Sequence, residues 1–509
     1  MKYYITTPIY YVNDFPHIGH AYTTIAADVV SRWQRLHGKE VFFLTGTDEH
    51  GAKIAQAAKK QNESPKEFCD KIAKGFKATW KELDISNDGF IRTTDTKHKK
   101  AVQYFLDKLF TSKNIYKAKY NGLYCIQCEK FTTEDELDEN GCCVDHKQKP
   151  VHHSEENYFF KLSAFKDKLL EILSDEKHPQ HMAVFPLTRR NEIIGKLKTG
   201  LEDISISRAA LEWGIPLPFD KNQTAYVWID ALLNYVSAIG YSTDEKQFKQ
   251  TWPAQLHLMA KDILWFHSVI WPAMLLALGI ETPKKVFAHG FFTINGEKMS
   301  KTLGNVIRPS QMIEKFGKDA TRYLTLSLFP FGVDGNISWN ALTDKYNVDL
   351  ANNLGNLVAR TTTMIDKYFE GTIPERKGKS EFSVFNEIKS IDALFEDLSF
   401  TQCITKIQKC IDSANRYIDS TAPWKMAKEN NPDLSNVMFD LLQSIGIIAI
   451  YLIPFMPTVS QNIWHQIGEK TKVEDFALEF FKKAKTPDFP HPGRNIAKGE
   501  ILFPRITDK

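Results

Sequence analysis

Two short segments carry side chains that could bind the phosphates of a nucleotide. They are His17-Ile18-Gly19-His20 near the start of the chain and Lys298-Met299-Ser300-Lys301-Thr302 far downstream. Each places two cationic or hydrogen-bond-donating groups three residues apart, which brings them to one side of a helix or turn. Gly19 lets a nucleotide approach the backbone closely. Together the two segments could hold the triphosphate of ATP from both sides.

Either segment alone has an ordinary structural explanation. Two histidines around a glycine arise readily by chance, and most lysine-rich loops are simply solvated. The two segments occur in this order, however, and the chain between them is long enough to fold a nucleotide-binding domain. Their combination therefore favours phosphate binding.

The first segment falls between two predicted strands. Residues 2–7 are apolar and β-branched, helical periodicity runs from His17 to about His37, and residues 40–46 form a second apolar run. A strand–helix–strand unit requires a right-handed crossover and a parallel sheet. The histidines then lie at a helix N-terminus, where N–H groups and the helix dipole favour phosphate. The glycine fingerprint of dinucleotide sites is missing after the first strand, so such a site is not indicated.

Residues 116–225 differ from their surroundings and look like an insertion. They contain Cys125-Ile126-Gln127-Cys128 and Cys143-Val144-Asp145-His146, two ligand pairs each separated by two residues. This spacing suits one tetrahedral structural Zn²⁺ bound by Cys125, Cys128, Cys143 and His146. Cys142 could replace Cys143, although its spacing to the histidine would be longer. Clustering of thiols by chance is the alternative, and the scarcity of cysteines elsewhere argues against it.

Composition limits the remaining possibilities. A chain of 509 residues suggests three or four domains, and a net charge of +3 does not by itself indicate a nucleic-acid partner. Sheet-like segments return at 255–260 and 285–289, and from about Asn347 the pattern becomes that of an α-helical bundle. The apolar runs 269–280 and 445–456 are shorter than a membrane span, and the N-terminus does not resemble a signal peptide. We therefore expect a soluble cytoplasmic protein without membrane contact.

The two phosphate-binding segments resemble the signature motifs of class I aminoacyl-tRNA synthetases. Further segments narrow the resemblance to the methionyl-tRNA synthetase family, in its form with a single zinc knuckle. They are Thr6–Asn13, Gly46–Gly51, Tyr226–Ala231 and Lys261–Ile263, and the resemblance extends to at least Trp424. Thr302 departs from the family pattern, which has serine there, but the hydroxyl is retained.

The resemblance implies an α/β fold with five parts. These are a Rossmann-like catalytic domain in two halves (1–115 and 226–297), a zinc-bearing insertion (116–225), a loop and stem-contact region (298–346) and an α-helical anticodon-binding domain (347–509). It also implies methionine–tRNA ligase activity. ATP with Mg²⁺ activates L-methionine to methionyl-adenylate, and the acyl group passes to the 3′-terminal ribose of elongator or initiator methionine tRNA.

The family assigns roles to particular residues. His17, His20, Lys298 and Lys301 are the expected catalytic residues, and with Gly19 and Ser300 they bind ATP. The expected methionine pocket consists of Ile9, Tyr11, Asp48, Trp228, Ala231, Leu232, Tyr235, Ile263, His267 and Trp271, with Asp48 binding the substrate amine. Without the flanking motifs, aromatic residues at helical spacing are more often ordinary core. Pro8 and Leu232 differ from some family members, which have alanine and proline there.

Asn352, Asn356, Arg360 and Trp424 match the anticodon-reading residues of the family. The first three lie on one helix face, where amides and a guanidinium can bond to base edges, and an indole can stack on an unpaired base. Without the family, a solvated polar face explains the helix equally well.

Other functions fit the sequence less well. Synthetases for leucine, isoleucine or valine need a larger insertion than 116–225, and a cysteine-specific enzyme would place its zinc ligands within the nucleotide domain. A tRNA-binding protein without activity would not need both phosphate-binding motifs, and a small-molecule adenylyltransferase would not need the helical bundle. The sequence ends without an appended oligonucleotide-binding barrel, which favours a monomer.

Overall fold

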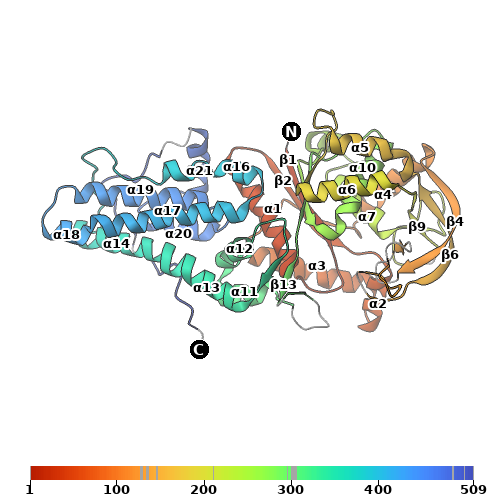
Figure 1. Cartoon of the computed structure of the whole chain (residues 1–509), viewed down its shortest axis with the longest axis horizontal. Helices are drawn as coiled ribbons and strands as arrows, with labels where there is room; N and C mark the ends of the chain where they lie inside the picture. Colours follow the sequence, from red (N-terminus) through yellow and green to blue (C-terminus); the bar gives the residue numbers. More distant parts are fainter. Residues whose placement is uncertain are drawn as a thin grey trace.

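The computed structural model describes residues 2–125, 130–132, 137–144, 147–209, 211–294, 296–299, 306–483, 487–497 and 499–507. At positions 120, 121, 130, 131, 153, 297 and 298 only the backbone is described. The molecule is elongated (Figure 1). A helical bundle forms one end, a central parallel sheet lies in the middle, and an antiparallel sheet lies at the other end.

The central sheet has six strands, and every neighbouring pair is parallel. In spatial order they are β3 (Gly89–Arg92), β2 (Val41–Asp48), β1 (Tyr3–Tyr11), β11 (Leu256–Ala260), β12 (Lys285–His289) and β7 (Ala183–Phe185). The predicted parallel sheet and its four predicted strands are therefore confirmed. The edge strand β7 was not predicted, because three residues are too few to show a period in the sequence. It comes from inside the segment 116–225.

The direction of chain progression reverses between β1 and β11. From β1 the chain moves outward through β2 and β3, and it returns to the other side of β1 with β11. Ligands of open parallel sheets bind at such a switch point, beyond the carboxyl ends of the strands. The helix α1 (Ile18–Leu36) starts beyond β1, and the 3₁₀ turn η3 (Lys261–Ile263) follows β11 directly. The fold therefore brings the predicted phosphate site and part of the predicted pocket to one edge.

Helices cover both faces of this sheet, and each face has its own apolar core. On the face of α1 lie α2 (Ala52–Lys60), α3 (Pro65–Glu82), α11 (Pro309–Phe316) and α12 (Lys318–Ser327). On the other lie α4 (Thr96–Thr111), η2 (Leu162–Phe165), α5 (Lys166–Ser174), α6 (Leu187–Thr199), α7 (Val227–Leu232), α8 (Asn234–Ser237), α9 (Glu245–Thr251), the π-helix η4 (Phe266–Ile270) and α10 (Trp271–Ala277).

Three smaller sheets complete the strand inventory of the described residues. The antiparallel sheet at the end of the molecule consists of β5 (Lys130–Thr132), β4 (Ile115–Cys125), β6 (Val151–Phe160) and β8 (Ile204–Ser205), in that order. The strands β9 (Ser207–Arg208) and β10 (Thr224–Ala225) pair with each other. The third sheet contains β14 (Glu297–Lys298), β13 (Phe292–Ile294) and β15 (Gly335–Ile337).

The predicted helical bundle is confirmed. It contains α13 (Trp339–Lys345), the π-helix η5 (Tyr346–Gly355), α14 (Asn356–Phe369), α15 (Phe385–Ile388), α16 (Ile391–Glu396), α17 (Phe400–Thr421), α18 (Pro423–Lys428), α19 (Leu434–Leu452), α20 (Pro457–Gln466) and α21 (Val473–Lys482). The helix α19 is long and apolar enough to span a membrane by length and composition, and it is longer than the apolar run expected from sequence. Its apolar window is 89% buried, since α14, α17, α20 and α21 pack around it. Burial within the bundle therefore explains its composition.

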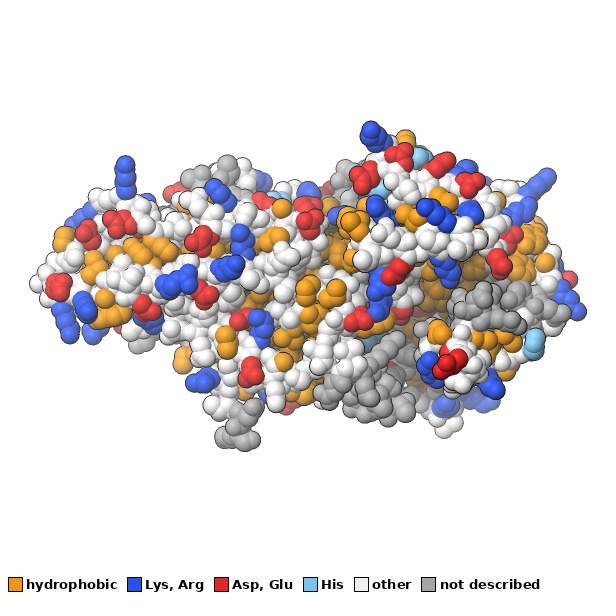
Figure 2. All heavy atoms as spheres, in the orientation of Figure 1, with side chains coloured by type: hydrophobic (Ala, Val, Ile, Leu, Met, Phe, Trp, Pro, Cys, Tyr) orange, Lys and Arg blue, Asp and Glu red, His pale blue; other side chains and the backbone are white. Residues whose placement is uncertain are grey.

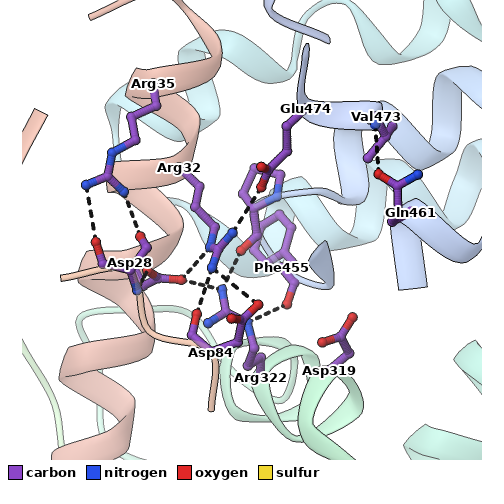
Figure 3. Close-up of polar contacts among 12 residues, drawn as sticks. Asp28, Arg32, Arg35, Asp84, Asp319, Arg322, Phe455, Gln461, Val473 and Glu474 are labelled. Atoms are coloured by element: carbon purple, nitrogen blue, oxygen red, sulfur yellow. Dashed lines mark hydrogen bonds and ion pairs between the residues drawn. The ribbon is translucent and has the colours of Figure 1, made fainter. Parts of the chain in front are cut away.

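A buried charge cluster joins α1 to the bundle (Figure 3). Arg322 of α12 is fully buried and lies 2.7 Å from Asp28 of α1, and it also donates to the backbone carbonyls of Pro454 and Phe455. Arg32 contacts the same aspartate at 2.8 Å and Glu474 of α21 at 3.1 Å. Burial would raise the pKa of Asp28, but the two guanidinium groups hold it well below its usual value. These contacts fix α1 between the sheet and the bundle.

Candidate active site

His17 begins α1 and its side chain caps it. The Nδ1 atom of His17 accepts a hydrogen bond from the Gly19 amide at 3.1 Å, and Nδ1 of His20 accepts from the His17 amide at 3.3 Å. Histidine is not a usual N-cap residue, because Ser, Thr, Asp and Asn provide better acceptors. Both rings are partly exposed at the switch point of the sheet.

These two bonds fix the tautomer of each histidine. A neutral imidazole has one accepting and one proton-bearing nitrogen, and here a backbone N–H occupies the accepting side of both rings. The proton must therefore reside on Nε2 in His17 and in His20. The cap thus orients two Nε2–H donors at a helix N-terminus, an arrangement suited to phosphate oxygens.

Gly19 is required by the conformation of His17. A Cβ at position 19 would lie 2.9 Å from Cε1 of the His17 ring, too close for any side chain. The same hypothetical Cβ would lie 3.7 Å from Cε of Met299. The second predicted phosphate-binding segment therefore begins against the first, although the two are far apart in sequence.

The other flank of the lysine-rich segment also lies on the first motif. The Ile18 amide donates to the carbonyl of Ile307 at 2.9 Å. The backbone of Lys298 belongs to β14, whereas its side chain and the whole of Ser300, Lys301 and Thr302 lie outside the described part of the chain. The fold thus brings Met299 of the segment, and Ile307 beyond it, to the start of α1.

The residues predicted to bind methionine gather on the other face of the sheet. Ile9 and Tyr11 come from β1, Asp48 ends β2 opposite Tyr11 in the strand register, Trp228, Ala231 and Leu232 lie on α7, Tyr235 on α8, Ile263 on η3, His267 on η4 and Trp271 on α10. Most of the apolar ones belong to a single core cluster, and α7 packs against η4. The residues Trp228, Ala231 and Tyr235 do not share one helix, because α7 ends before Leu233 and α8 begins after it. The helical spacing of His267 and Trp271 is widened by the π-helix η4.

Tyr235 and His267, two buried members of this cluster, form a hydrogen bond with each other. Nδ1 of His267 lies 2.9 Å from the Ile263 carbonyl and must donate to it, so Nε2 accepts from the Tyr235 hydroxyl at 2.7 Å. Burial lowers the pKa of His267 to about 4, which keeps the ring neutral at physiological pH. Their mutual pairing leaves a neutral surface that suits a thioether.

Several neighbours of the pocket were not singled out from the sequence. The Phe266 ring stacks on Trp228 with centroids 3.9 Å apart. The Trp213 indole donates to the Glu49 carbonyl at 2.6 Å, which ties the insertion to the segment carrying Asp48. Their contacts depend on tertiary folding, and the sequence contained no signal for them beyond residue type.

Buried ionic side chains surround the same segment. Glu49 is fully buried, and its carboxylate accepts hydrogen bonds from Nε and Nη2 of Arg92 at 2.6 and 2.9 Å. Asp230 of α7 lies 2.6 Å from Nδ1 of His50 and 2.7 Å from Nε2 of His98. His50 and Asp230 both stand within segments that carried the family resemblance. For Asp230, a charged residue within the apolar run 227–232 was the available signal.

The predicted anticodon residues come from three helices: Asn352 lies on η5, Asn356 and Arg360 lie on α14, and Trp424 lies on α18 at the far end of the bundle. The helices α14 and α18 pack together there (Figure 1). Asn352 and Asn356 are exposed, the Trp424 indole is 38% exposed, and Arg360 contacts Asp419 of α17 at 2.7 Å. On the face drawn in Figure 2, acidic and basic side chains of the described residues are interspersed along the bundle.

The predicted zinc ligands are only partly described. Cys125 ends β4 and is 2% exposed, and Cys143 is 4% exposed. Cys142 is partly exposed, and its thiol faces the Asn140 carbonyl. Cys128 and His146 lie outside the described residues. Among the residues that are described, three or more His, Cys, Asp or Glu side chains do not gather at a metal-binding distance.

Comparisons with known proteins agree with this geometry. The family model for class I tRNA synthetases (M) matches residues 3–144 and 132–362, and that for the anticodon-binding domain of tRNA ligase matches residues 383–495. A methionine–tRNA ligase of Caldanaerobacter subterraneus subsp. tengcongensis is 45% identical, over 99% of this chain and 79% of the relative. One of Streptomyces coelicolor is 40% identical, over 100% of this chain and 97% of the relative.

A solved structure extends the similarity to the whole fold. Mycobacterium tuberculosis methionyl-tRNA synthetase in complex with methionyl-adenylate superposes with a TM-score of 0.93 at 35% identity, covering 99% of this chain and 100% of that one. These matches cover nearly the full length of the chain, including the sheet with its switch point and the helical bundle. The chain belongs to the methionine–tRNA ligase family of class I aminoacyl-tRNA synthetases.

Proposed function

We propose that this chain is a methionine–tRNA ligase, which activates L-methionine with ATP and transfers the methionyl group to the 3′-terminal ribose of elongator or initiator methionine tRNA. The single observation that carries the proposal is the meeting of Gly19 with Met299. It brings two motifs from opposite ends of the catalytic region to one helix N-terminus. Full-length similarity to ligases of this specificity supports it independently.

His17, His20, Lys298 and Lys301 are the proposed catalytic residues, and with Gly19 and Ser300 they bind ATP. In adenylate formation the methionine carboxylate attacks the α-phosphate and pyrophosphate leaves. The protein needs to hold the groups in line and stabilise charge on the phosphoryl oxygens. The Nε2–H groups of His17 and His20 are oriented for this by their caps. Mg²⁺ carried by ATP would share in neutralising the phosphates.

The proposed methionine site is a cluster of residues from β1, β2 and the helices on one face of the sheet. Its members are Ile9, Tyr11, Asp48, Trp228, Ala231, Leu232, Tyr235, Ile263, His267 and Trp271. Its aromatic rings suit sulfur, since each sulfur–aromatic contact contributes about 0.3–1.5 kcal/mol. Asp48 is placed at the carboxyl end of β2, where its carboxylate can bind the substrate amine. The carboxylate of methionine would then point toward the histidines of α1.

The far end of the bundle is the proposed anticodon site. Asn352, Asn356 and Arg360 would bond to base edges, and the exposed Trp424 indole would stack on an unpaired base. The packing of α14 against α18 supports their joint use. The proposed parts of the chain are a catalytic domain (1–115 and 226–297), an insertion (116–225), a stem-contact region (298–346) and an anticodon domain (347–509).

One structural Zn²⁺ bound by Cys125, Cys128, Cys143 and His146 is proposed for the insertion. The described residues fit this choice, because two thiols from separate segments are buried in a small sheet domain and Cys142 is not. Such a site supports local folding and leaves water unactivated. A monomeric cytoplasmic enzyme is the proposed form.

ATP–pyrophosphate exchange tests the proposal directly. The purified protein is screened against the twenty amino acids and then assayed for aminoacylation of methionine tRNA. Exchange with methionine and charging of its tRNA are expected. Selective exchange with leucine, isoleucine, valine or cysteine would support another class I synthetase, and no exchange with any amino acid would support a tRNA-binding protein without this activity.

A further inference from the structure

Asp230 lies on α7, the helix that carries three residues of the proposed methionine pocket. It is 1% exposed and stands on α7 between Trp228 and Ala231. Its Oδ2 atom lies 2.6 Å from Nδ1 of His50, and its Oδ1 atom lies 2.7 Å from Nε2 of His98. Each carboxylate oxygen thus has its own histidine, and the two histidines come from different elements.

The contacts link three elements that the sheet does not join. His50 belongs to the segment after β2 and is two residues beyond Asp48, whereas His98 lies in the first turn of α4. His98 also reaches α8, because its Nδ1 atom lies 2.7 Å from Oγ of Ser237. Ser237 is two residues beyond Tyr235 of the pocket. The break between α7 and α8 is therefore bridged by one histidine.

Charge gives these contacts their direction. A carboxylate only accepts hydrogen bonds, so Nδ1 of His50 and Nε2 of His98 must both carry protons. Burial alone would raise the pKa of Asp230, but interaction with His50 and His98 lowers it to about 2. The group is thus ionised at physiological pH, and charge-assisted bonds of this length are short and orienting.

The corner that His98 and Ser237 form lies beside a hollow that opens to solvent. A cavity of about 420 Å³ borders His98, Ser237 and Ala238 on the side of β2 and β3. Hydrogen bonds are directional, so they restrain the orientation of a buried side chain in addition to its packing. The bonds from Asp230 through His98 to Ser237 supply that restraint.

We infer that Asp230 is a positioning residue for methionine recognition, which sets the segment carrying Asp48 against α7 and α8 through His50 and His98. The inference deepens the proposed function and rests on it. Buried ionic clusters often contribute little net stability, and in some proteins they select one geometry. The Asp230→Asn change keeps the shape and leaves no unpaired buried charge. The expected consequence is therefore on substrate affinity more than on unfolding.

Asp230→Asn tests this with little change in shape. The amide is uncharged and accepts through one oxygen only, so both charge-assisted bonds are weakened and one histidine must lose its bond or change its tautomer. The methionine KM in ATP–pyrophosphate exchange should rise about ten- to a hundredfold, the worth of one hydrogen bond to a charged group, with the ATP KM near wild type. Asp440→Asn is the matched control, because Asp440 is equally buried and contacts Arg376 at 2.9 Å within the bundle.

A second pair of variants guards against misfolding. The His98→Gln amide can still donate to Asp230, so the methionine KM should stay close to wild type, whereas His98→Leu should raise it as Asp230→Asn does. An unchanged methionine KM in folded Asp230→Asn and His98→Leu would overturn the inference. The inference would also be overturned if Asp230→Asn and His98→Leu raised the KM values of methionine and ATP alike and lowered the melting temperature, as the control Asp440→Asn does. Absence of methionine-dependent exchange in the wild type would instead overturn the proposed function, and the inference with it.

Discussion

The imidazole rings of His17 and His20 stack on each other, with centroids 3.7 Å apart and an interplanar angle of 22°. The stack exists because each Nδ1 atom accepts from a backbone amide of the same helix turn. One turn of α1 thus caps itself and orients two Nε2–H donors. Capping and the proposed phosphate binding use opposite nitrogens of the same rings, so substitution can separate them.

His20→Asn and His20→Gln should have different effects. The asparagine oxygen can replace Nδ1 and keep the bond from the His17 amide, but it leaves no donor at the Nε2 position. Its melting temperature should stay near wild type while the exchange kcat falls about 100- to 1,000-fold, typical of one lost transition-state donor. The glutamine amide reaches the Nε2 position and should retain more activity. Equal activity of the two variants would contradict the assignment of the nitrogens.

Lys301→Ala should slow adenylate formation far more than it weakens methionine binding. The lysine acts on charge that is redistributed in the transition state, and its loss should cost about 2–4 kcal/mol. Pre-steady-state exchange measures this, with the exposed Lys246 of α9 changed to alanine as control. An unchanged kcat with a tenfold rise in methionine KM would show that the lysine has another role.

The purified protein should contain one zinc ion, and zinc binding should require some cysteines and not others. Cys128→Ser removes a ligand and should lose the metal, whereas Cys142→Ser should keep it, because the Cys142 thiol faces the Asn140 carbonyl. Elemental analysis of both variants and of the wild type decides. Full zinc content in Cys128→Ser, or none in carefully prepared wild type, would refute the proposed site.

Trp424→Ala should separate charging from activation. Loss of one stacked base costs about 1–3 kcal/mol, so kcat/KM for aminoacylation should fall about ten- to a hundredfold. Methionine-dependent exchange should remain near wild type, because it needs no tRNA. Tyr104, an exposed aromatic residue on α4, provides the matched control. Equal losses in both assays would make Trp424 a folding residue.

Two buried histidines make stability depend on pH. Burial lowers the pKa of His267 and of His289 from 6.5 to about 4. The unfolded chain therefore binds protons between these values that the folded chain does not, and the free energy of unfolding falls as pH drops from about 6.5 to about 4. Each group contributes up to about 3 kcal/mol at about 1.4 kcal/mol per pKa unit.

His289→Gln should reduce this dependence. Urea unfolding at pH 7 and pH 4.5 should show a smaller loss for the variant than for wild type, and His152→Gln, at an exposed position, should behave as wild type. The pKa of Asp230 is lowered to about 2, so its contribution is lost only below about pH 4 and stays outside this window. Parallel losses in wild type and His289→Gln would contradict the assignment.

The sequence by itself determined the parallel sheet, the helix that starts with His17, and the bundle after Asn347. Each depends on local periodicity, on short motifs or on helix ends, which neighbouring residues encode. It also supplied the residues of the proposed phosphate site and the proposed methionine pocket, since these occur in recognisable segments.

Tertiary structure alone decided how these segments meet. The approach of Met299 to Gly19, the stacking of Phe266 on Trp228, and the pairing of Asp230 with His50 and His98 join residues from separate elements. Such contacts form only when the chain closes long loops, and no local pattern encodes them. The strand β7 escaped prediction for the same reason, because only its pairing with β12 makes three residues a strand.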